Sequence, residues 1–250
     1  MRGDNQIIRG RRSRTPLTNR LLAVLPPLES SELLARAEPV ELMPGQVLSE
    51  PFEAITHVYF PLDALISLLA VTSDGSVVEI GMIGNEGLAG AAALLGKSSL
   101  PYRTMVHGPG RALRTDLLTL EALAAQHVRV QRLILRYLHA LLAQLAQTAV
   151  CNRFHSTGQR LAYLLLASQD RLSSATFPWS RDFLAHLLGA DRASVNLTVT
   201  QMKKAGLIRQ ARGQITILDR EGLLQTSCEC YGIIRAEFDQ LFASTLMIPT

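Results

Sequence analysis

The stretch that decides the fold covers residues 180–208 and has the sequence SRDFLAHLLGADRASVNLTVTQMKKAGLI. Its apolar residues recur every three or four positions in two runs, which predicts two short helices. Ser180 and Asp191 stand where these helices would begin, and both residue types accept hydrogen bonds from the free N–H groups of a helix start. Gly189 separates the runs and tolerates the left-handed conformation of a tight turn. The stretch therefore predicts a helix-turn-helix.

The second predicted helix has an apolar face and a polar face. Val195, Val199 and Met202 form the apolar face. The polar face is expected to comprise Arg192, Ser194, Asn196 and Thr198, with Lys203 and Lys204 at the helix end. A helix of this kind fits the major groove of DNA, where short polar side chains near its N-terminus reach base edges. The sequence therefore predicts double-stranded DNA as the ligand.

Basic residues are concentrated around this stretch. Residues 151–220 hold ten Lys and Arg against four Asp, whereas residues 21–150 hold eight basic and twelve acidic residues. Residues 1–20 hold six Arg, one Asp and few apolar residues, so we expect a disordered basic tail there. Lys and Arg release counterions from phosphates, so this distribution favours a polyanionic partner. An ordinary solvated surface would explain the charge equally well.

Composition and motifs narrow the class of protein. The 250-residue chain is long enough for two modest domains, and 48% of its residues are hydrophobic. It has no uncharged apolar run of membrane-spanning length and no signal-peptide pattern, so we expect a cytoplasmic protein without membrane contact. Phosphate-binding loops, dinucleotide fingerprints, nucleophile elbows and zinc-protease motifs are missing, so we expect that it is not an enzyme.

Residues 21–126 predict a β-rich domain preceded by a short helical segment. Short apolar segments alternate with turn signals, and Asp74-Gly75 between two of them is typical of a hairpin. The segments are residues 58–60, 65–71, 77–83, 103–108 and 111–115. Segments at this spacing predict a sandwich, a jelly roll or a barrel.

A helical period begins after Asp116 and predicts a helix over residues 117–126 and a long helix over residues 127–152. The apolar stripe of the long helix comprises Val130, Leu133, Ile134, Tyr137, Leu138, Leu141, Leu145 and Ala149. The stripe is wide enough to cover the β domain and to pair with a second copy of the helix. We assign Tyr137, Leu141 and Leu145 to a dimer contact and leave Ile134 unassigned. The alternative is a helix buried wholly within its own subunit.

Residues 153–222 predict the rest of a DNA-binding domain. An amphipathic helix over residues 155–171 precedes the helix-turn-helix. A small hairpin follows, and it would form a wing with Arg209 and Arg212 beside its tip. Residues 223–250 form a C-terminal segment, in which a final helix is predicted from residue 221 to residue 243.

This order of elements resembles the Crp/Fnr family of bacterial transcription regulators. The resemblance implies an α+β fold with an N-terminal β jelly-roll domain of the cyclic-nucleotide-binding type, a long dimerisation helix and a C-terminal winged helix-turn-helix. It also implies a homodimer on two-fold symmetric DNA, with RNA polymerase as a further partner. By resemblance, Ser180 and Arg181 match positions that contact phosphates. Arg192, Ala193, Ser194 and Asn196 match the face of the recognition helix that reads bases.

The recognition helix departs from the usual family pattern. That pattern has Arg-Glu and a second Arg four residues after the Glu, whereas this chain has Ala193 and Leu197 at the last two positions. Two base contacts of the bidentate kind are therefore lost, and we expect a different operator sequence. Arg192 is kept, and whether it contacts a guanine or a phosphate is left open. A ligand-sensing module whose winged helix contacts a protein is the competing interpretation.

The predicted effector site is a weakened version of the family's nucleotide-binding cassette. Arg103-Thr104 match its second half, but Ala93 stands where the carboxylate that binds ribose would be. We therefore do not expect a cyclic nucleotide. An anionic effector of another kind is expected to contact Glu86, Gly87, Arg103 and Thr104, if the β domain binds one.

The three cysteines do not form a disulfide framework. Cys228 and Cys230 would point to different sides of a helix, while Cys151 and His155 have a spacing that places them on one helical face. We expect small buried packing residues here, and neither a metal nor a cofactor. The chain has no cysteine before Cys151, so the N-terminal cluster of the iron–sulfur members is missing.

Overall fold

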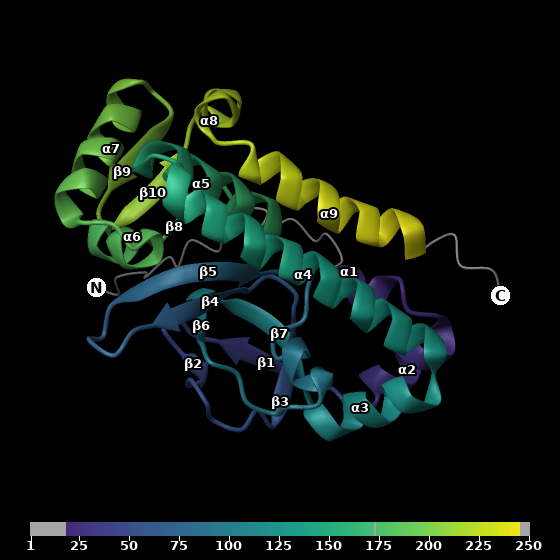
Figure 1. Ribbon diagram of the computed structural model, residues 1–250. Helices are drawn as coiled ribbons and strands as arrows, with labels where there is room; N and C mark the ends of the chain where they lie inside the picture. The colour runs from purple at the N-terminus through teal and green to yellow at the C-terminus, as the bar shows by residue number, and fades with distance from the viewer. Residues whose placement is uncertain (1–18, 173, 246–250) are drawn as a thin grey trace, which may run out of the picture.

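The computed structural model describes residues 19–172 and 174–245. The chain forms a β domain, a long helix that crosses it, and a further domain that carries the helix-turn-helix (Figure 1). The last helix returns along the long one, so two segments far apart in the sequence lie side by side. The predicted α+β architecture is confirmed.

Residues 1–18 of the predicted basic tail lie outside the described residues, whereas the end of that tail is ordered. Asn19 is buried and caps the first helix, α1 (Arg20–Ala23), with its side-chain oxygen. Its amide group donates hydrogen bonds to the carbonyl oxygens of Pro61 and Gly87, at 3.0 and 2.8 Å. These bonds anchor Asn19 to the β domain, so the folded part of the chain begins before residue 21.

The β domain consists of two antiparallel sheets. One sheet has the order β1 (Glu38–Leu42), β7 (Gly110–Asp116) and β3 (His57–Pro61). The other has the order β2 (Val47–Ser49), β6 (Arg103–Gly108), β4 (Leu65–Val71) and β5 (Val77–Ile83). Strands β4, β5 and β6 have the predicted bounds, and Asp74-Gly75 lies in the turn between β4 and β5. Gly75 has a φ of +82°, which explains why glycine is needed in that turn.

The helices of this half of the chain are α2 (Pro27–Leu34), the 3₁₀ helix η1 (Ala91–Leu95), α3 (Leu117–Gln126) and α4 (Val128–Phe154). Helix α3 has the predicted bounds, and α4 runs two residues past its predicted end. One side of α4 packs against β5, η1 and α3. The apolar stripe of α4 therefore covers the β domain, as its width predicts.

By length and composition alone, α4 would be able to cross a membrane, and it is the one such helix in the described ranges. Its packing against β5, α3 and α9 accounts for many of its apolar residues, which belong to the hydrophobic core. The absence of membrane contact stays a prediction.

The second domain begins with α5 (Thr157–Leu172) and continues with β8 (Thr176–Phe177), α6 (Arg181–Leu188), α7 (Arg192–Lys204), β9 (Ile208–Ala211), β10 (Gln214–Ile217) and α8 (Arg220–Thr226). Strands β8, β10 and β9 form one small sheet, which contains the predicted wing hairpin. Strand β8 was not predicted, because two residues are too few to show a period.

The two helix starts and the turn of the helix-turn-helix are confirmed. Ser180 caps α6 by accepting a hydrogen bond from the N–H of Phe183 at 3.1 Å. Asp191 caps α7 in the same way, and its carboxylate accepts from the N–H of Ser194 at 2.9 Å. Gly189 ends α6 with a φ of +53°. The polar cap residues and the glycine therefore set the bounds of both helices.

The single final helix predicted over residues 221–243 is wrong. The chain forms α8 and then α9 (Cys230–Thr245), with a break between them. Ser227 ends α8 in an extended conformation, and its hydroxyl donates to the carbonyl oxygen of Leu224. Such side-chain bonds compete with helical ones, which explains the break. Helix α9 then packs along α4 and α5.

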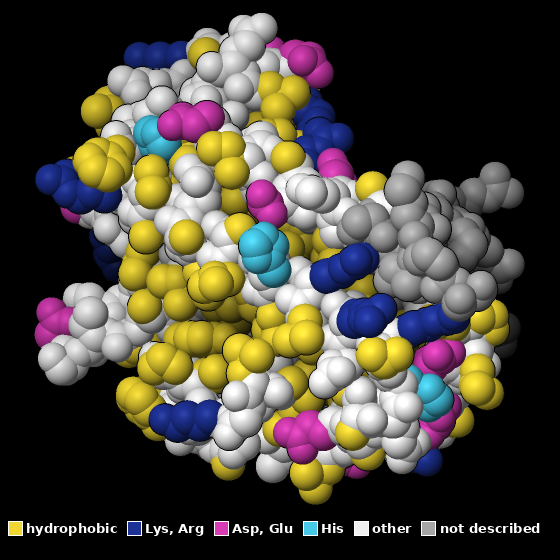
Figure 2. Space-filling model, turned by 45° about the vertical axis from the view of Figure 1, so that its right-hand side comes forward, with side chains coloured by type: hydrophobic (Ala, Val, Ile, Leu, Met, Phe, Trp, Pro, Cys, Tyr) yellow, Lys and Arg dark blue, Asp and Glu magenta, His cyan; other side chains and the backbone are white. Residues whose placement is uncertain are grey.

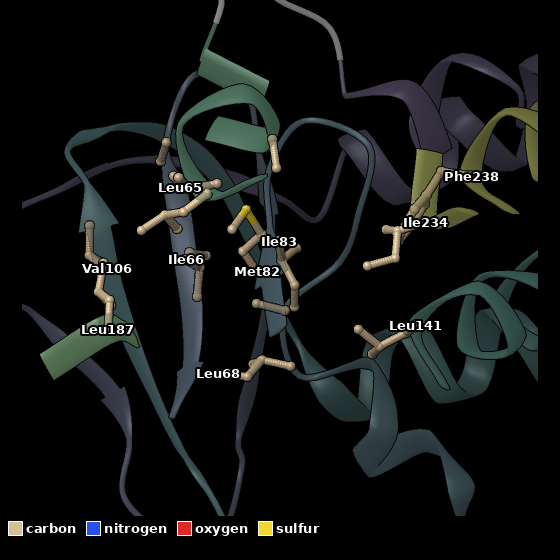
Figure 3. Packing of buried hydrophobic residues seen from close by; sticks show 14 of the residues in the cluster. Leu65, Ile66, Leu68, Met82, Ile83, Val106, Leu141, Leu187, Ile234 and Phe238 are labelled. Carbon is tan, nitrogen blue, oxygen red and sulfur yellow. The ribbon is translucent and has the colours of Figure 1, made fainter. Parts of the chain in front are cut away.

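One hydrophobic core connects the whole molecule. In Figure 3, Ile83 of the larger sheet lies on the side of that sheet that faces Leu141 of α4 and Phe238 of α9. Leu187 of α6 and Val106 of β6 belong to the same cluster, so the helix-turn-helix shares the core of the β domain. The two domains are therefore held in a fixed relation in this conformation.

Candidate nucleic-acid interface and effector site

Helix α7 presents one face outward, and that face differs from the prediction at one residue. Val195, Val199 and Met202 are buried, as expected. Thr198 is also buried, because its position falls between these residues on the side of α7 that packs against α5. The assignment of Thr198 to the DNA contact is therefore wrong.

The outward face of α7 is formed by Ala193, Leu197, Thr200, Gln201 and Lys204, all of which are exposed. Leu197 leaves 60% of its surface uncovered, which is unusual for leucine in the middle of a helix. Thr200 and Gln201 were not predicted at this face, although their spacing of three and four residues from Leu197 places them on it. A mixed apolar and polar strip is thus available to a ligand.

Arg181 connects the three elements of the interface. Its Nε donates to the side-chain oxygen of Gln210 on β9 at 2.8 Å, and its Nη1 donates to that of Asn196 on α7 at 3.1 Å. Helix α6, helix α7 and the wing therefore hold one another in place. Because the oxygen of Asn196 already accepts this bond, its NH₂ group is the part left for a base.

Arg192 lies at the start of α7 and forms only a weak ion pair, so its guanidinium can bind a ligand. Its Nε lies 3.1 Å from a carboxylate oxygen of Asp182, and both side chains are well exposed. An ion pair of this kind contributes only about 0–1 kcal/mol, so a phosphate or a base can replace it. Ser194 is committed differently, because its hydroxyl donates to the Asp191 carboxylate at 2.6 Å.

Basic side chains flank the recognition helix. The wing turn is made by Arg212 and Gly213, which both have positive φ values, of 50° and 73°. A two-residue turn of this type matches the twist of a hairpin, and it leaves the Arg212 side chain exposed. Lys203 and Lys204 are exposed at the other end of α7. Positive charge therefore stands on both sides of the strip.

The DNA-binding domain rests on the β domain. A Cβ atom added to Gly189 would come within 2.8 Å of Val78 on β5, so the turn of the helix-turn-helix touches the β4–β5 hairpin. The His107 ring on β6 lies 4.5 Å from the ring of Trp179 and 5.1 Å from that of Phe183, between centroids. The chain just before α7 is thus in direct contact with the β domain.

A buried polar group lies beneath this contact. The Ser67 hydroxyl donates to a Glu79 carboxylate oxygen at 2.6 Å and lies 2.8 Å from Nδ1 of His107. These three residue types also occur in hydrolases, but here the serine is fully buried and bonds the carboxylate directly. The group links β4, β5 and β6, and all three side chains are buried, so it serves the packing of the sheet.

The structure does not bring the predicted effector residues together. The guanidinium of Arg171 on α5 binds Glu86, with Nε 2.6 Å from its carboxylate. Arg103 on β6 instead binds the Glu50 carboxylate at 2.8 Å. Thr104 is buried within its sheet. The proposed anion site at Glu86, Gly87, Arg103 and Thr104 is therefore corrected, because other side chains already neutralise its charged members.

The space beside the cassette is filled as well. A Cβ on Gly87 would come within 2.7 Å of the Tyr137 hydroxyl, which donates to the carbonyl oxygen of Leu88 at 3.2 Å. Burial raises the pKa of Tyr137. The remaining cavity measures about 20 Å³ and has an apolar lining that includes Leu88 and Val130. A volume of this size holds a single water molecule, not a nucleotide.

A larger cavity of about 260 Å³ lies between α5, α9 and the turn after β5. Its lining includes Glu86, Arg171, Tyr163, Arg20 and Asp239. One carboxylate oxygen of Glu86 is buried without a hydrogen-bond partner among the described residues. Burial lowers the pKa of Arg171, but the neighbouring Glu86 and Tyr163 more than compensate and raise it. This cavity has the size and polarity for a small charged molecule.

The long helix buries two of the three residues predicted at a dimer contact. Tyr137 and Leu141 are buried within their own subunit, and only Leu145 is half-exposed. The exposed apolar residues of α4 are instead Val128, Leu135, Leu142, Val150 and Phe154. The first three are separated by seven residues each, which puts them on one line along the helix. Figure 2 shows a broad hydrophobic area with a hollow on the face that includes α4.

The cysteines are buried, as predicted, but not arranged as predicted. Cys228 lies in the break before α9, and Cys230 is the first residue of α9, so the two do not diverge on one helix. Cys151 and Cys228 are hydrogen-bonded, with 3.5 Å between their sulfur atoms. This bond lowers the pKa of Cys228 and raises that of Cys151. Sequence reasoning missed the cluster because its members come from distant segments.

Residues 159–226 match the family of Crp-like helix-turn-helix domains. No curated protein matches the chain in sequence. The structure of FixK2 from Bradyrhizobium japonicum is 17% identical over 77% of this chain and 98% of that chain, with a TM-score of 0.65. The c-di-GMP responsive regulator CLP from Xanthomonas campestris is 15% identical over 76% of this chain and 98% of that chain, with a TM-score of 0.62.

A transcriptional regulator of the CRP family from Thermus thermophilus has a similar structure. It is 17% identical over 75% of this chain and 96% of that chain, with a TM-score of 0.64. At these identities the likeness shows the fold. The match of the sequence to the helix-turn-helix family adds the type of the second domain.

Proposed function

We propose that the chain is a transcription regulator of the Crp/Fnr type and that it acts as a homodimer on a two-fold symmetric operator. The match of residues 159–226 to Crp-like helix-turn-helix domains and the likeness in fold support this proposal. The exposed strip of α7 is the observation that carries the proposal. Two such strips would enter successive major grooves about 34 Å apart. The resemblance also implies contact with RNA polymerase. We include this contact in the proposal and assign no residue to it.

The composition of the strip supports a particular kind of operator. Ala193 and Leu197 are exposed apolar side chains, and apolar side chains in the major groove contact the methyl group of thymine. Gln201 is exposed near them, and glutamine recognises adenine through two hydrogen bonds. We therefore propose half-sites with A·T pairs opposite the middle of α7. Arg181, Arg212, Lys203 and Lys204 would hold the phosphates on both sides.

The exposed stripe of α4 supports the dimer. Val128, Leu135 and Leu142 repeat every seven residues, and each is more than half exposed. Leucine and valine at this spacing pair two helices in a left-handed coiled coil. The proposed contact therefore runs through these residues, with Leu145 at its edge. Tyr137 and Leu141 would support it from inside the subunit.

The contact between the domains supports regulation. The turn before α7 touches β5, and the His107 ring contacts Trp179 and Phe183. A signal that weakens this contact would free the DNA-binding domain to change its spacing in the dimer. We propose the 260 Å³ cavity at Glu86 and Arg171 as the effector site. Native mass spectrometry of the freshly purified protein checks this, because a retained small molecule that Glu86→Gln abolishes would support it, and a ligand unaffected by that change would oppose it.

Selection of bound duplexes from a random library tests the function. The full-length protein is expected to select an inverted repeat with a spacing of about 10–10.5 base pairs between half-site centres. Fluorescence anisotropy with the selected and a scrambled duplex then measures specificity across a range of salt concentrations. Affinity should fall linearly in a plot of log K against log salt. Equal affinity for both duplexes, or no duplex binding, would favour the alternative in which the winged helix contacts a protein.

A further inference from the structure

All three cysteines of the chain meet one histidine where the long helix passes into the DNA-binding domain. Cys151 lies in the last turn of α4, and His155 directly follows that helix. Cys228 and Cys230 come from the break between α8 and α9. One donor atom from each of these four residues lies within 4.8 Å of every other. Segments more than seventy residues apart in the sequence therefore supply four potential metal ligands to one point.

The distances within the cluster suit a single tetrahedral ion. The sulfur atoms of Cys151 and Cys228 are 3.5 Å apart, and the Cys230 sulfur lies 3.4 Å from Nδ1 of His155. A zinc ion with sulfur ligands at about 2.3 Å requires neighbouring sulfurs about 3.8 Å apart in a tetrahedron. The other separations within the cluster stay within 4.8 Å, so shifts of up to about 1 Å would close the four donors around one ion.

The surroundings of the cluster orient its donors. Nε2 of His155 lies 3.4 Å from a carboxylate oxygen of Glu229, which leaves Nδ1 facing the sulfurs. The Gln147 side chain donates to the sulfur of Cys230 at 3.2 Å. A carboxylate behind a ligating histidine, and an amide on a thiolate, are the outer contacts that metal sites commonly have. The packing of small buried residues would not require this carboxylate and this amide.

The charge around the cluster fits a bound dication with three thiolates. Such a site carries a net charge of −1, and it needs a cation nearby because it is largely buried. Arg160 of α5 supplies such a cation close to Cys151. It is half-buried and donates to the side chain of Asn152, the residue that follows Cys151 in the chain, at 2.8 Å.

We propose that Cys151, His155, Cys228 and Cys230 form a closed structural zinc site. Three thiolates and one imidazole are a donor set that structural zinc sites use. Binding converts the thiols into thiolates and releases their protons to solvent. All four protein ligands are present, so the ion has no open position for a substrate.

The position of the site gives it a consequence for the fold. The chain between α4 and α5 is only two residues long, and His155 is one of them. The ion would join this connection to the start of α9, which packs along α4 and α5. The angle between the long helix and the DNA-binding domain is therefore fixed by the metal. Its removal should loosen that connection before it unfolds either domain.

Metal analysis of the full-length protein, purified without chelators, tests the proposal. We expect about one zinc ion per chain by elemental mass spectrometry. After removal of zinc, Co²⁺ should give the visible absorption of tetrahedral thiolate coordination, and Zn²⁺ should abolish it. Three free thiols with no metal after incubation with Zn²⁺ would overturn the proposal. A disulfide between Cys151 and Cys228 in the freshly purified protein would also overturn it.

A matched pair of surface variants keeps the test independent of folding defects. Glu229→Gln removes the carboxylate behind His155 and should weaken zinc binding about 10- to 100-fold in a competition with a chromophoric chelator. Glu237→Gln is the control, because Glu237 on α9 also pairs with a histidine, His139 of α4, at 3.7 Å. It should leave zinc affinity unchanged. Equal effects of both variants, or no effect of Glu229→Gln, would contradict the proposed role of Glu229 and with it the assignment of His155 as a ligand.

Discussion

The recognition helix and the cassette of the β domain use their polar groups in opposite ways. On α7 the side chains that would meet a ligand are exposed, and Arg192 is held only by an exposed ion pair. In the cassette, Glu86 is paired with Arg171 and Arg103 with Glu50. Polar groups that the protein satisfies internally cost free energy to redirect toward a ligand, whereas exposed groups do not. The proposed DNA-reading surface is thus accessible to a ligand, whereas the charged residues predicted for the cassette are already paired within the protein.

The same difference explains what the β domain does in this conformation. The space beside the predicted cassette is filled by Tyr137 and apolar side chains, and the Glu86–Arg171 pair ties the β domain to α5. In this conformation the β domain therefore packs firmly against the domain that carries the helix-turn-helix. Substitutions in the paired region and in the exposed regions should therefore have different effects.

The largest effect is expected from Arg171→Leu. This change leaves Glu86 buried without its partner, and breaking a buried pair from one side costs about 3–5 kcal/mol. Urea unfolding measures the loss, and the double variant E86Q/R171L should recover most of it. Arg103→Leu is the control, because the more exposed pair with Glu50 should contribute no more than about 1 kcal/mol. Equal losses for both arginines would remove the contrast between a closed and an open site.

The next effect concerns the exposed stripe of α4. Leu142→Asp would place a charge in the proposed dimer contact, where it should weaken association by about 100-fold or more, or about 2.8 kcal/mol. Sedimentation of the protein over a range of concentrations measures the change. Leu118→Asp is the control, because Leu118 is at least as exposed as Leu142 but lies on α3. A monomeric wild-type protein at micromolar concentration would refute the dimer.

A smaller effect is expected where Gly87 meets Tyr137. The methyl group of Gly87→Ala would lie 2.7 Å from the Tyr137 hydroxyl and 2.8 Å from Ile83. Overpacking of this kind costs about 1–3 kcal/mol in thermal or urea unfolding. Gly232→Ala in α9 meets nothing within 4 Å and should stabilise the protein by about 0.5–1 kcal/mol. If Gly87→Ala leaves the free energy of unfolding unchanged, Tyr137 and Ile83 do not fill the space beside Gly87.

The smallest effect is a pH dependence at the start of α7. The hydroxyl and the N–H of Ser194 hold the pKa of Asp191 below its ordinary value of 3.8. Because the folded pKa is lowered, the cap contributes stability above the unfolded pKa and loses it as the pH falls through the folded value. Titration followed by NMR should show this low pKa, and Ser194→Ala should raise it toward 3.8. No change in Ser194→Ala would mean that the cap does not depend on that hydroxyl.

Local features of the fold were predictable from the sequence. Ser180, Asp191 and Gly189 mark the helix-turn-helix by their own hydrogen-bonding and backbone preferences, so no distant contact is needed to find them. The alternating apolar segments give β4, β5 and β6 for the same reason. The prediction for Thr198 was wrong because it followed the polar residue type. The position of Thr198 on the buried side of α7 decides its role.

Contacts between distant residues were not predictable. Arg171 reaches Glu86 across 85 residues, and Cys151 reaches Cys228 across 77. Neither spacing follows a period of a helix or strand, because tertiary packing brings the segments together. The break before α9 also hid the cysteine cluster from prediction. A continuous helix would have pointed Cys228 and Cys230 to different sides. The Glu86–Arg171 pair at the proposed effector cavity and the cysteine cluster therefore became visible only in three dimensions.

A change in the exposed strip of α7, followed by a second duplex selection, shows whether this strip reads DNA. Ala193→Glu with Leu197→Arg introduces the residues of the usual family pattern at two exposed positions. We expect a folded protein that selects an inverted repeat of the same spacing with different bases opposite the middle of α7. An unchanged selected sequence would contradict the claim, because base recognition would then lie elsewhere on the protein.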